Sequence, residues 1–194
     1  MSSPADLASV GEGRIAALLG LEPAWPGARL LGRAFTVQGG GGDNLALHHA
    51  IANAGPGEVI VLAVGGERSR AHCGGIVVTA AKARGAAGIV LDGAIRDRAE
   101  LEAIGLPVFH LGTSPLKLGK DGPVELRVPV ELQGVRIEHG DLIAADVDGI
   151  VVVPGAIADE LLAAAALLGV REREVLAQVA EGKTTLEIYG YDAR

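Results

Sequence analysis

Aromatic residues are scarce in this sequence, which has two Phe, two Tyr and one Trp among 194 residues. Hydrophobic residues nevertheless make up 49% of the chain, so Ala, Val, Ile and Leu must build the core. Cysteine is scarcer still, because Cys73 is the only one. A single cysteine excludes an internal disulfide and is typical of a reducing compartment.

Positive charge is also in deficit, with 17 Lys and Arg against 24 Asp and Glu, for a net charge of −7. The chain has no basic stripe, so we expect no nucleic-acid partner. No apolar run reaches the roughly 18 residues of a membrane helix. The N-terminus lacks the basic segment of a secretory signal. We therefore expect a cytoplasmic protein without membrane contacts.

Glycine, by contrast, is abundant, with 29 residues placed mostly where apolar runs end. This distribution predicts many tight turns in a globular protein. The length predicts a single domain over residues 1–194, with a core over about 30–155 and a helical region over about 156–194.

Strand and helix patterns alternate in the first 112 residues. We predict strands over 32–38, 58–64, 88–92 and 107–112, and helices over 5–20, 43–55, 71–85 and 97–105. Alternation of this kind is typical of βαβ units around a parallel sheet.

The second half of the chain changes character. Strand patterns over 124–132, 135–146 and 149–155 are separated by turn signals, which predicts β-hairpins. From Ala156 to Glu181 the sequence predicts one or two helices, broken near Gly169, and then an ordered tail over 185–191. The predicted fold class is α/β with mixed sheets and C-terminal helices.

Several familiar motifs fail on inspection. The glycine cluster at 39–42 does not satisfy G-x-G-x-x-G, because the last position falls on Asn44 or Leu45. The adjacent pairs His48-His49 and His72-Cys73 lack metal-site spacing, so we interpret them as structural. Cys73 is interpreted as a small buried residue. Residues 146–149, "DVDG", are followed by apolar residues and indicate a hairpin turn rather than a calcium loop.

Arg96 and Asp97 directly follow the apolar run 88–91. A structural interpretation is available, since Asp97 and Glu100 have the spacing of a capping box. A functional interpretation is equally available, because sites in α/β proteins form beyond the carboxyl ends of strands. There Arg96 could bind a small carboxylate with two hydrogen bonds, and Asp97 could hold Mg²⁺. The sequence leaves both interpretations open.

A second strand-to-helix turn, at Gly74 and Gly75, lies nearby in the predicted order of elements. Backbone N–H groups at such a turn can bind an oxyanion. A carboxylate clamp, a metal ligand and N–H donors together favour a site for a 2-oxo acid.

The sequence resembles the RraA-like family over roughly residues 30–190. The resemblance rests on "GDN" (42–44), "PGEVIVL" (56–62), "CGGIVVTAAKARGAAGIVLDGAIRD" (73–97), "PVF" (107–109) and "GDLIAADVDGIVVVP" (140–154). That family includes 4-hydroxy-4-methyl-2-oxoglutarate (HMG) aldolases and the regulator of RNase E activity. The resemblance implies a swivelling β/β/α fold in a homotrimer or hexamer, with sites between subunits.

The resemblance also implies roles for residues. Arg96 would bind the carboxylate and enolate of pyruvate, and Asp97 would contact Mg²⁺ or Mn²⁺. Backbone amides at Gly74, Gly75 and Ile76 would help to hold the substrate. The implied activity is HMG-type aldol cleavage, oxaloacetate decarboxylation, or both. The alternative is a non-catalytic protein that regulates a ribonuclease.

This chain departs from the family pattern at Gly75, where the aldolases carry an acidic residue that positions water for proton transfer. The family site also uses a glutamate from the C-terminal helix of a neighbouring subunit, and Glu172 is the best match here. Arg68 and Arg70 are candidates for binding a second substrate carboxylate. Asp43 and Asn44 could line the site or cap a helix.

Overall fold

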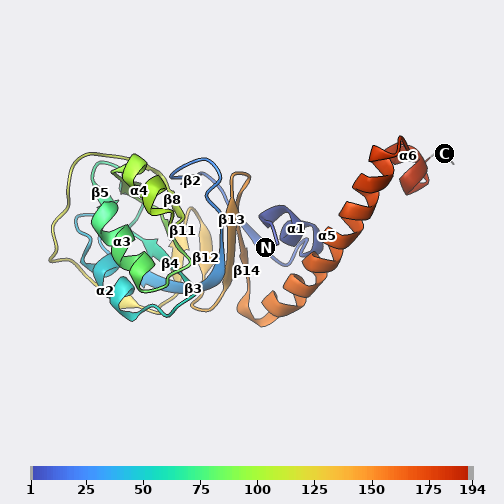
Figure 1. The fold of residues 1–194 in the computed structure, drawn as a ribbon. Helices are drawn as coiled ribbons and strands as arrows, with labels where there is room; N and C mark the ends of the chain where they lie inside the picture. The colour runs from blue at the N-terminus through green and yellow to red at the C-terminus, as the bar shows by residue number, and fades with distance from the viewer. Residues whose placement is uncertain (1, 192–194) are drawn as a thin grey trace.

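The computed structural model describes residues 2–191. Its main element is a mixed nine-stranded sheet in the order β1-β14-β13-β3-β4-β6-β8-β2, with β10 paired to β3 (Figure 1). The strands of this sheet are β1 (Ala16–Leu18), β2 (Glu22–Pro23), β3 (Leu30–Gln38), β4 (Glu58–Ala63), β6 (Gly88–Leu91), β8 (Val108–His110), β10 (Glu125–Leu126), β13 (Leu142–Asp146) and β14 (Gly149–Val153).

The centre of the sheet is parallel, as the alternating pattern predicts. Strands β3, β4, β6 and β8 pair in parallel, and the helices between them cover one face of the sheet (Figure 1). These helices are α2 (Leu45–Asn53), α3 (Gly75–Ala83) and α4 (Arg98–Ile104). Their aliphatic side chains pack with Phe35, Ile60 and Leu91 of the sheet in one buried cluster. The scarcity of aromatic residues is thus met by aliphatic packing.

A second, smaller parallel sheet carries the chain beyond the ends of these strands. It consists of β5 (Ala71–Cys73), β7 (Ala94–Ile95) and β9 (Gly112–Thr113), in the order β5-β7-β9. The sequence prediction assigned residues 71–74 to a helix, and this was wrong. The Ala and Val content of 71–85 suits a helix, but Ala71 and Cys73 pair with β7, and α3 begins only at Gly75.

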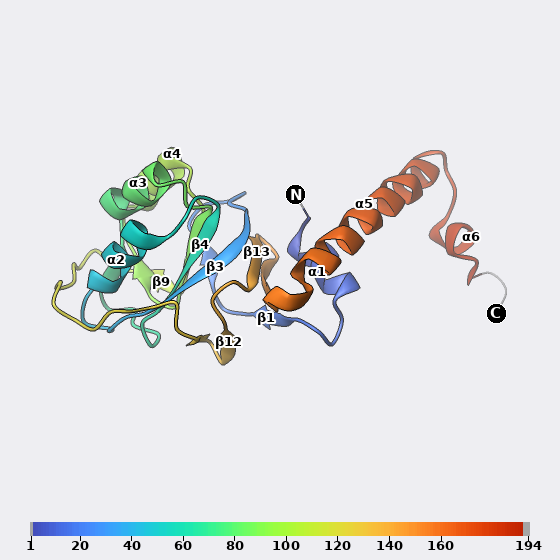
Figure 2. The same cartoon turned by 90° about the horizontal axis from the view of Figure 1, so that it is seen from below.

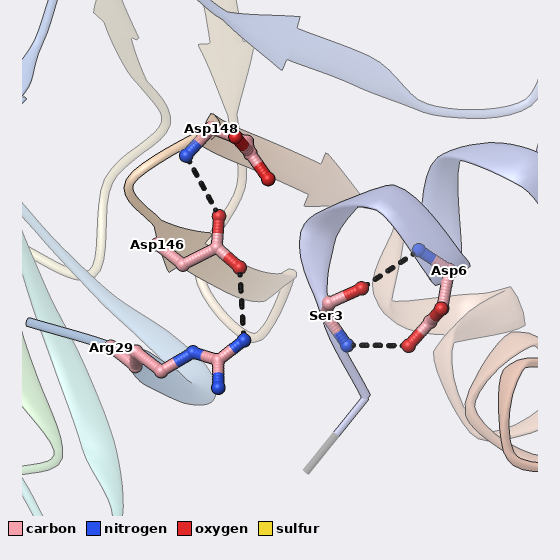
Figure 3. Close-up of polar contacts among 5 residues, drawn as sticks. All are labelled: Ser3, Asp6, Arg29, Asp146 and Asp148. Carbon is pink, nitrogen blue, oxygen red and sulfur yellow. Dashed lines mark hydrogen bonds and ion pairs between the residues drawn. The ribbon is translucent and has the colours of Figure 1, made fainter. Parts of the chain in front are cut away.

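Hairpins make up the second half of the main body, as predicted. Strand β11 (Val130–Leu132) pairs with β12 (Val135–Ile137), and β13 pairs with β14. In the turn between β13 and β14, Asp146 Oδ1 accepts a hydrogen bond from the Asp148 N–H, and Arg29 Nη2 lies 3.4 Å from Asp146 Oδ2 (Figure 3). The "DVDG" stretch is therefore a hairpin turn, as expected.

The N-terminal helix and the start of the long C-terminal helix meet on β13 and β14. Helix α1 (Pro4–Val10) begins with a capping box between Ser3 and Asp6 (Figure 3) and packs with the first turns of α5 (Ala158–Ala180). A 3₁₀ turn, Gly155–Ile157, leads into α5. Beyond Ala165, α5 projects away from the body and ends near α6 (Thr185–Tyr189) (Figure 2).

Two further helix predictions were wrong. The helix expected over 5–20 ends at Val10, because Gly13 adopts φ +73° and Ala16–Leu18 pairs with β14 as β1. The break expected near Gly169 is absent, because α5 is continuous through this residue. One glycine costs a helix only about 1 kcal/mol, which the Ala- and Leu-rich flanks tolerate. None of the helices described here is both long and apolar enough to span a bilayer.

Candidate functional site

The small parallel sheet brings the two predicted turns together. Strand β5 ends at Cys73 and β7 ends at Ile95, and parallel strands place their carboxyl ends at the same edge. The Arg96 N–H donates to the Cys73 carbonyl at 2.9 Å. Gly74 and Gly75 therefore lie directly beside Arg96 and Asp97.

Gly74 is required for this close approach. A Cβ on Gly74 would lie 2.7 Å from Asp97 Oδ2 and 3.1 Å from Arg96 Nε. No side chain fits there without displacing the Arg–Asp pair. The next residue, Gly75, allows an equally close approach of the Glu100 carboxylate, because a Cβ on Gly75 would overlap that carboxylate.

The side chain of Asp97 does not cap its helix. Asp97 is the first residue before α4, yet neither it nor Glu100 makes the hydrogen bonds of a capping box, so that structural interpretation was wrong. Asp97 instead has φ +61°, a left-handed conformation that is uncommon outside glycine and typical of functional sites. Its Oδ2 accepts from the Gly75 N–H at 3.3 Å and lies 3.4 Å from Arg96 Nε.

The amino-terminal turn of α3 supplies free backbone donors. The Val78 N–H is the first in α3 to reach a carbonyl four residues back, that of Gly74. The N–H groups of Ile76 and Val77 therefore have no acceptor within the helix, and no side chain caps it. Both residues line the same cavity as Arg96 and Asp97. The N-terminal end of the helix dipole adds a partial positive charge there.

The cavity has a volume of about 540 Å³, which is enough for a small acid. Its opposite wall consists of residues from the start of α2, from β5 and from the loop after β9. In this loop, Gly119 forms a β-bridge with Asp43, and Lys117 forms one with Ala71. The residues on this wall are Asn44, His48, Ala71, His72, Lys117, Leu118, Gly119 and Lys120. The side chains of Asn44, His48 and His72 each present a buried polar atom without a hydrogen-bond partner among the described residues.

Sequence reasoning missed this wall. His48 and His72 were both interpreted as structural. His72 lies on a strand rather than a helix, and its fully buried ring is consistent with that interpretation, whereas the partly exposed His48 lines the cavity. Lys117 and Lys120 lie in an irregular loop with no motif to identify them. Capping a helix and lining the site were both left open for Asp43 and Asn44. Asp43 Oδ1 accepts from the Leu45 N–H at the start of α2, and Asn44 lines the cavity, so each residue takes one of the two roles.

Burial determines the protonation of two groups on the cavity wall. Removal from water lowers the pKa of His72, which favours the neutral ring. Burial also raises the pKa of the Cys73 thiol to about 12. A thiol of this kind is no nucleophile, and the interpretation of Cys73 as a small buried residue is confirmed.

Three predicted residues are not brought to this cavity within one chain. Glu172 is exposed on α5 and does not line the cavity. The first turns of α5 pack at the β13–β14 end of the sheet, whereas α3 and α4 cover its parallel strands (Figure 1). Arg68 and Arg70 are exposed and do not line the cavity, and Arg70 Nη1 donates to the Lys117 carbonyl at 2.9 Å. The cationic side chains on the far wall are those of Lys117 and Lys120 instead.

The donor set suits a hard divalent ion. Within residues 2–191, no group of three His, Cys, Asp or Glu side chains could hold a metal, so a zinc-type cage is not built. The carboxylates of Asp97 and Glu100 both line the cavity. One or two carboxylates are what Mg²⁺ usually takes from a protein, because it keeps several waters.

A known family matches most of this sequence. The RraA-like family, described as aldolase/RraA, matches residues 6–152, about three quarters of the chain. The chain belongs to the RraA-like family. The predicted fold class, a mixed α/β domain of RraA-like type with C-terminal helices, is thereby confirmed.

Relatives of this RraA-like chain carry two kinds of name. A putative HMG aldolase of Halalkalibacterium halodurans is 42% identical over 134 residues, which cover 69% of this chain and 64% of that protein. An HMG aldolase of Thermus thermophilus is 33% identical over 112 residues, covering 58% and 68%. The solved structure of the RNA-processing inhibitor RraA from Thermus thermophilus has a TM-score of 0.73 at 29% identity, covering 79% and 93%. The match spans less than two thirds of the Halalkalibacterium protein.

Proposed function

We propose that this protein is a divalent-metal-dependent lyase for small 2-oxo acids. The reaction is HMG-type aldol cleavage with release of pyruvate, decarboxylation of oxaloacetate, or both. The observation that supports this most is the meeting of Arg96, Asp97 and the amino-terminal turn of α3 at one cavity. The aldolase names of the relatives support the same reaction class.

Arg96 binds the substrate carboxylate in this proposal. Its Nε faces Asp97, and no hydrogen bond within residues 2–191 occupies the Nη1 and Nη2 atoms, which remain available for a bidentate contact. The same guanidinium stabilises the negative charge that grows on the enolate oxygen. The free N–H groups of Ile76 and Val77 offer the same acid group further donors, while the Gly75 N–H orients Asp97.

Asp97 would hold Mg²⁺ or Mn²⁺ through its carboxylate, whose orientation is set by the Gly75 N–H and Arg96. When bound, such an ion polarises the 2-oxo group as a Lewis acid. In aldol cleavage the C3–C4 bond breaks, its electron pair stays with C3 as the pyruvate enolate, and the C4 hydroxyl loses a proton to become a carbonyl. Decarboxylation leaves the same enolate and releases CO₂, so one site can serve both reactions.

The first experiment is to measure pyruvate release from HMG and from oxaloacetate with Mg²⁺ or Mn²⁺, and again with a chelator. We expect release that needs the metal and disappears in Asp97→Ala. Asp148→Ala, in the β13–β14 turn, is the control and should keep the wild-type rate. Unaltered activity in Asp97→Ala would refute the metal assignment. No release by the folded wild type would favour the ribonuclease-regulator alternative.

We also propose that the protein is a homotrimer or hexamer in which Glu172 enters the site of a neighbouring subunit. The support is that Glu172 is exposed and does not line the cavity of its own chain. It belongs to α5 beyond Ala165, the part of this helix that leaves the body (Figure 2). Co-expression of Asp97→Asn and Glu172→Gln chains tests this. Mixed oligomers should regain activity that neither variant has alone, whereas the absence of any recovery would contradict a shared site.

A further inference from the structure

The side chain of Glu100 has left the position that its sequence spacing predicts. Glu100 lies in the first turn of α4, three residues after Asp97, yet it does not bond to the start of its own helix. Within residues 2–191 neither of its carboxylate oxygens has a hydrogen-bond or ion-pair partner. The side chain instead lines the cavity that holds Arg96 and Asp97. A carboxylate without a partner in this cavity is available for chemistry.

The position of this carboxylate coincides with that of a missing side chain. Glu100 Oε2 lies 2.5 Å from the point that a Cβ on Gly75 would occupy, and Oε1 and Cδ are closer still. The carboxylate therefore fills the space that any side chain at position 75 would use. Position 75 is where the family resemblance led us to expect an acidic residue. In this chain the acid comes from α4, and the glycine makes room for it.

The surroundings of Glu100 suit a carboxylate that acts as a base. Glu100 lies against the first residue of α3, where the helix dipole is positive and favours negative charge. Arg96 lines the same cavity and offsets the charge of Asp97. Glu100 is exposed, so water can reach it. A general base needs its target within hydrogen-bond reach, directly or through one water.

We propose that Glu100 is the proton-transfer residue of this site, a role that rests on the function proposed above. In the cleavage direction its carboxylate takes the proton of the C4 hydroxyl as the C3–C4 bond breaks. The resulting carboxylic acid then gives the same proton to C3 of the enolate, which yields pyruvate and regenerates the carboxylate. In decarboxylation, Glu100 delivers to C3 a proton that it has taken from water.

The test compares Glu100→Gln with Glu102→Gln, a control on the same helix that does not line the cavity. Two readouts are needed besides pyruvate release. One is the Mg²⁺-dependent exchange of pyruvate methyl protons for deuterium, followed by NMR. The other is Mg²⁺-dependent binding of oxalate, a mimic of the pyruvate enolate, measured by calorimetry. Circular dichroism establishes that each variant is folded.

We expect Glu100→Gln to bind oxalate within about threefold of the wild type while its cleavage and exchange rates fall by about 10²- to 10³-fold, the usual range for loss of a general base. Glu102→Gln should match the wild type in every assay. Wild-type exchange rates in Glu100→Gln would overturn the proposal. So would loss of oxalate binding together with exchange, because Glu100 would then be an anchor for metal or substrate.

A rescue experiment separates chemistry from structure. The double variant Gly75→Asp/Glu100→Ala returns a carboxylate to position 75. Its rate of pyruvate release should be at least tenfold higher than that of Glu100→Ala alone. The absence of rescue in a folded double variant that still binds oxalate would count against the role. A wild-type protein that neither binds oxalate with Mg²⁺ nor releases pyruvate would instead refute the proposed function, and this role with it.

Discussion

Arg96 and Asp97 are adjacent in the chain but have separable tasks, because one is a cation for the substrate and the other an anion for a metal. Lysine keeps the charge of Arg96 but not its planar pair of donors. We expect Arg96→Lys to lower kcat/KM for pyruvate release by about 10²-fold, because one positioned donor to the enolate oxygen would be lost. Steady-state kinetics at saturating Mg²⁺ measures this, with Arg84→Lys on the far end of α3 as control. Equal losses in both variants would contradict the assignment.

His110 introduces a pH dependence of stability. It is 2% exposed on β8, and burial, together with the charge of Arg98, lowers its pKa from 6.5 to about 4. Between these values the unfolded chain binds a proton that the folded chain does not. The contribution of His110 to the free energy of unfolding is therefore fully present above pH 6.5 and is lost as the pH falls toward 4. Below pH 4 this residue causes no further loss of stability.

The loss attributable to His110 is on the order of 3 kcal/mol between pH 7 and pH 4. Urea unfolding at pH 7, 5.5 and 4.5 measures it. His110→Gln should flatten the dependence, although His72, with its pKa lowered in the same way, leaves some slope. His49→Gln, at an exposed position of α2, should keep the wild-type slope. An unchanged slope in His110→Gln would show that other groups cause the dependence.

Two glycines inside regular elements should respond in opposite ways to alanine. Gly32 lies in β3, and a Cβ there would collide with the Gly57 carbonyl and lie 3.1 Å from Val59 Cγ2. Gly169 lies in α5, where a Cβ would meet only Arg173 Nη1, at 3.7 Å.

We expect Gly32→Ala to lower the free energy of unfolding by about 2 kcal/mol, because the central strands cannot separate to admit a methyl group. Gly169→Ala should raise the local stability of α5 by about 0.5–1 kcal/mol, the difference in helix propensity. Urea unfolding measures the first change, and amide hydrogen exchange over residues 170–180 the second. A stabilising Gly32→Ala would contradict the close approach of β3 to the turn before β4.

Periodicity predicts long elements and misses short ones, and the site depends on short ones. The parallel strands β3, β4, β6 and β8 were all found from their apolar runs, and the helices α2, α3 and α4 between them were also predicted, although the start of α3 was placed four residues too early. Strands β5 and β7 have three and two residues, too few for any periodic signal. They exist because they pair with each other beyond the main sheet, and that pairing brings Gly74 to Arg96.

The projecting C-terminal helix bears on the assembly of the whole protein. Beyond the turns that pack on β13 and β14, α5 leaves Leu167 and Leu176 69% and 65% exposed. Apolar side chains on an extended helix are costly in water and favour association. If copies of the chain cover them, Leu167→Glu with Leu176→Glu should shift the oligomer toward monomer in light scattering. Val147→Glu, an exposed apolar position in the β13–β14 turn, should not.

Loss of the oligomer in that variant should also lower pyruvate release if Glu172 acts in a neighbouring subunit. It should leave Mg²⁺-dependent oxalate binding by the Arg96 and Asp97 cavity largely intact, because these groups belong to one chain. A monomeric variant with full activity would exclude any need for Glu172 of a second copy.

The sequence by itself determined the fold class, the parallel pairing of the central strands, and Arg96 and Asp97 as candidate site residues. These features depend on local pattern, because apolar runs form buried strands and the residues just after a parallel strand face the edge where sites form. The sequence could not decide whether Asp97 and Glu100 form a capping box, or whether another residue supplies the acid that is missing at Gly75. Both answers depend on how α3 packs beside α4.

Only the tertiary structure decided those points. Packing α3 beside α4 turns Glu100 away from its own helix and places its carboxylate against Gly75, so that a residue missing at one position is matched by one from another element. Bridges from the loop after β9 to Asp43 and Ala71 likewise bring Lys120 to the cavity that His48 lines. Contacts between elements distant in sequence leave no periodic trace in the chain, and they are what makes Arg96 and Asp97 part of a candidate site.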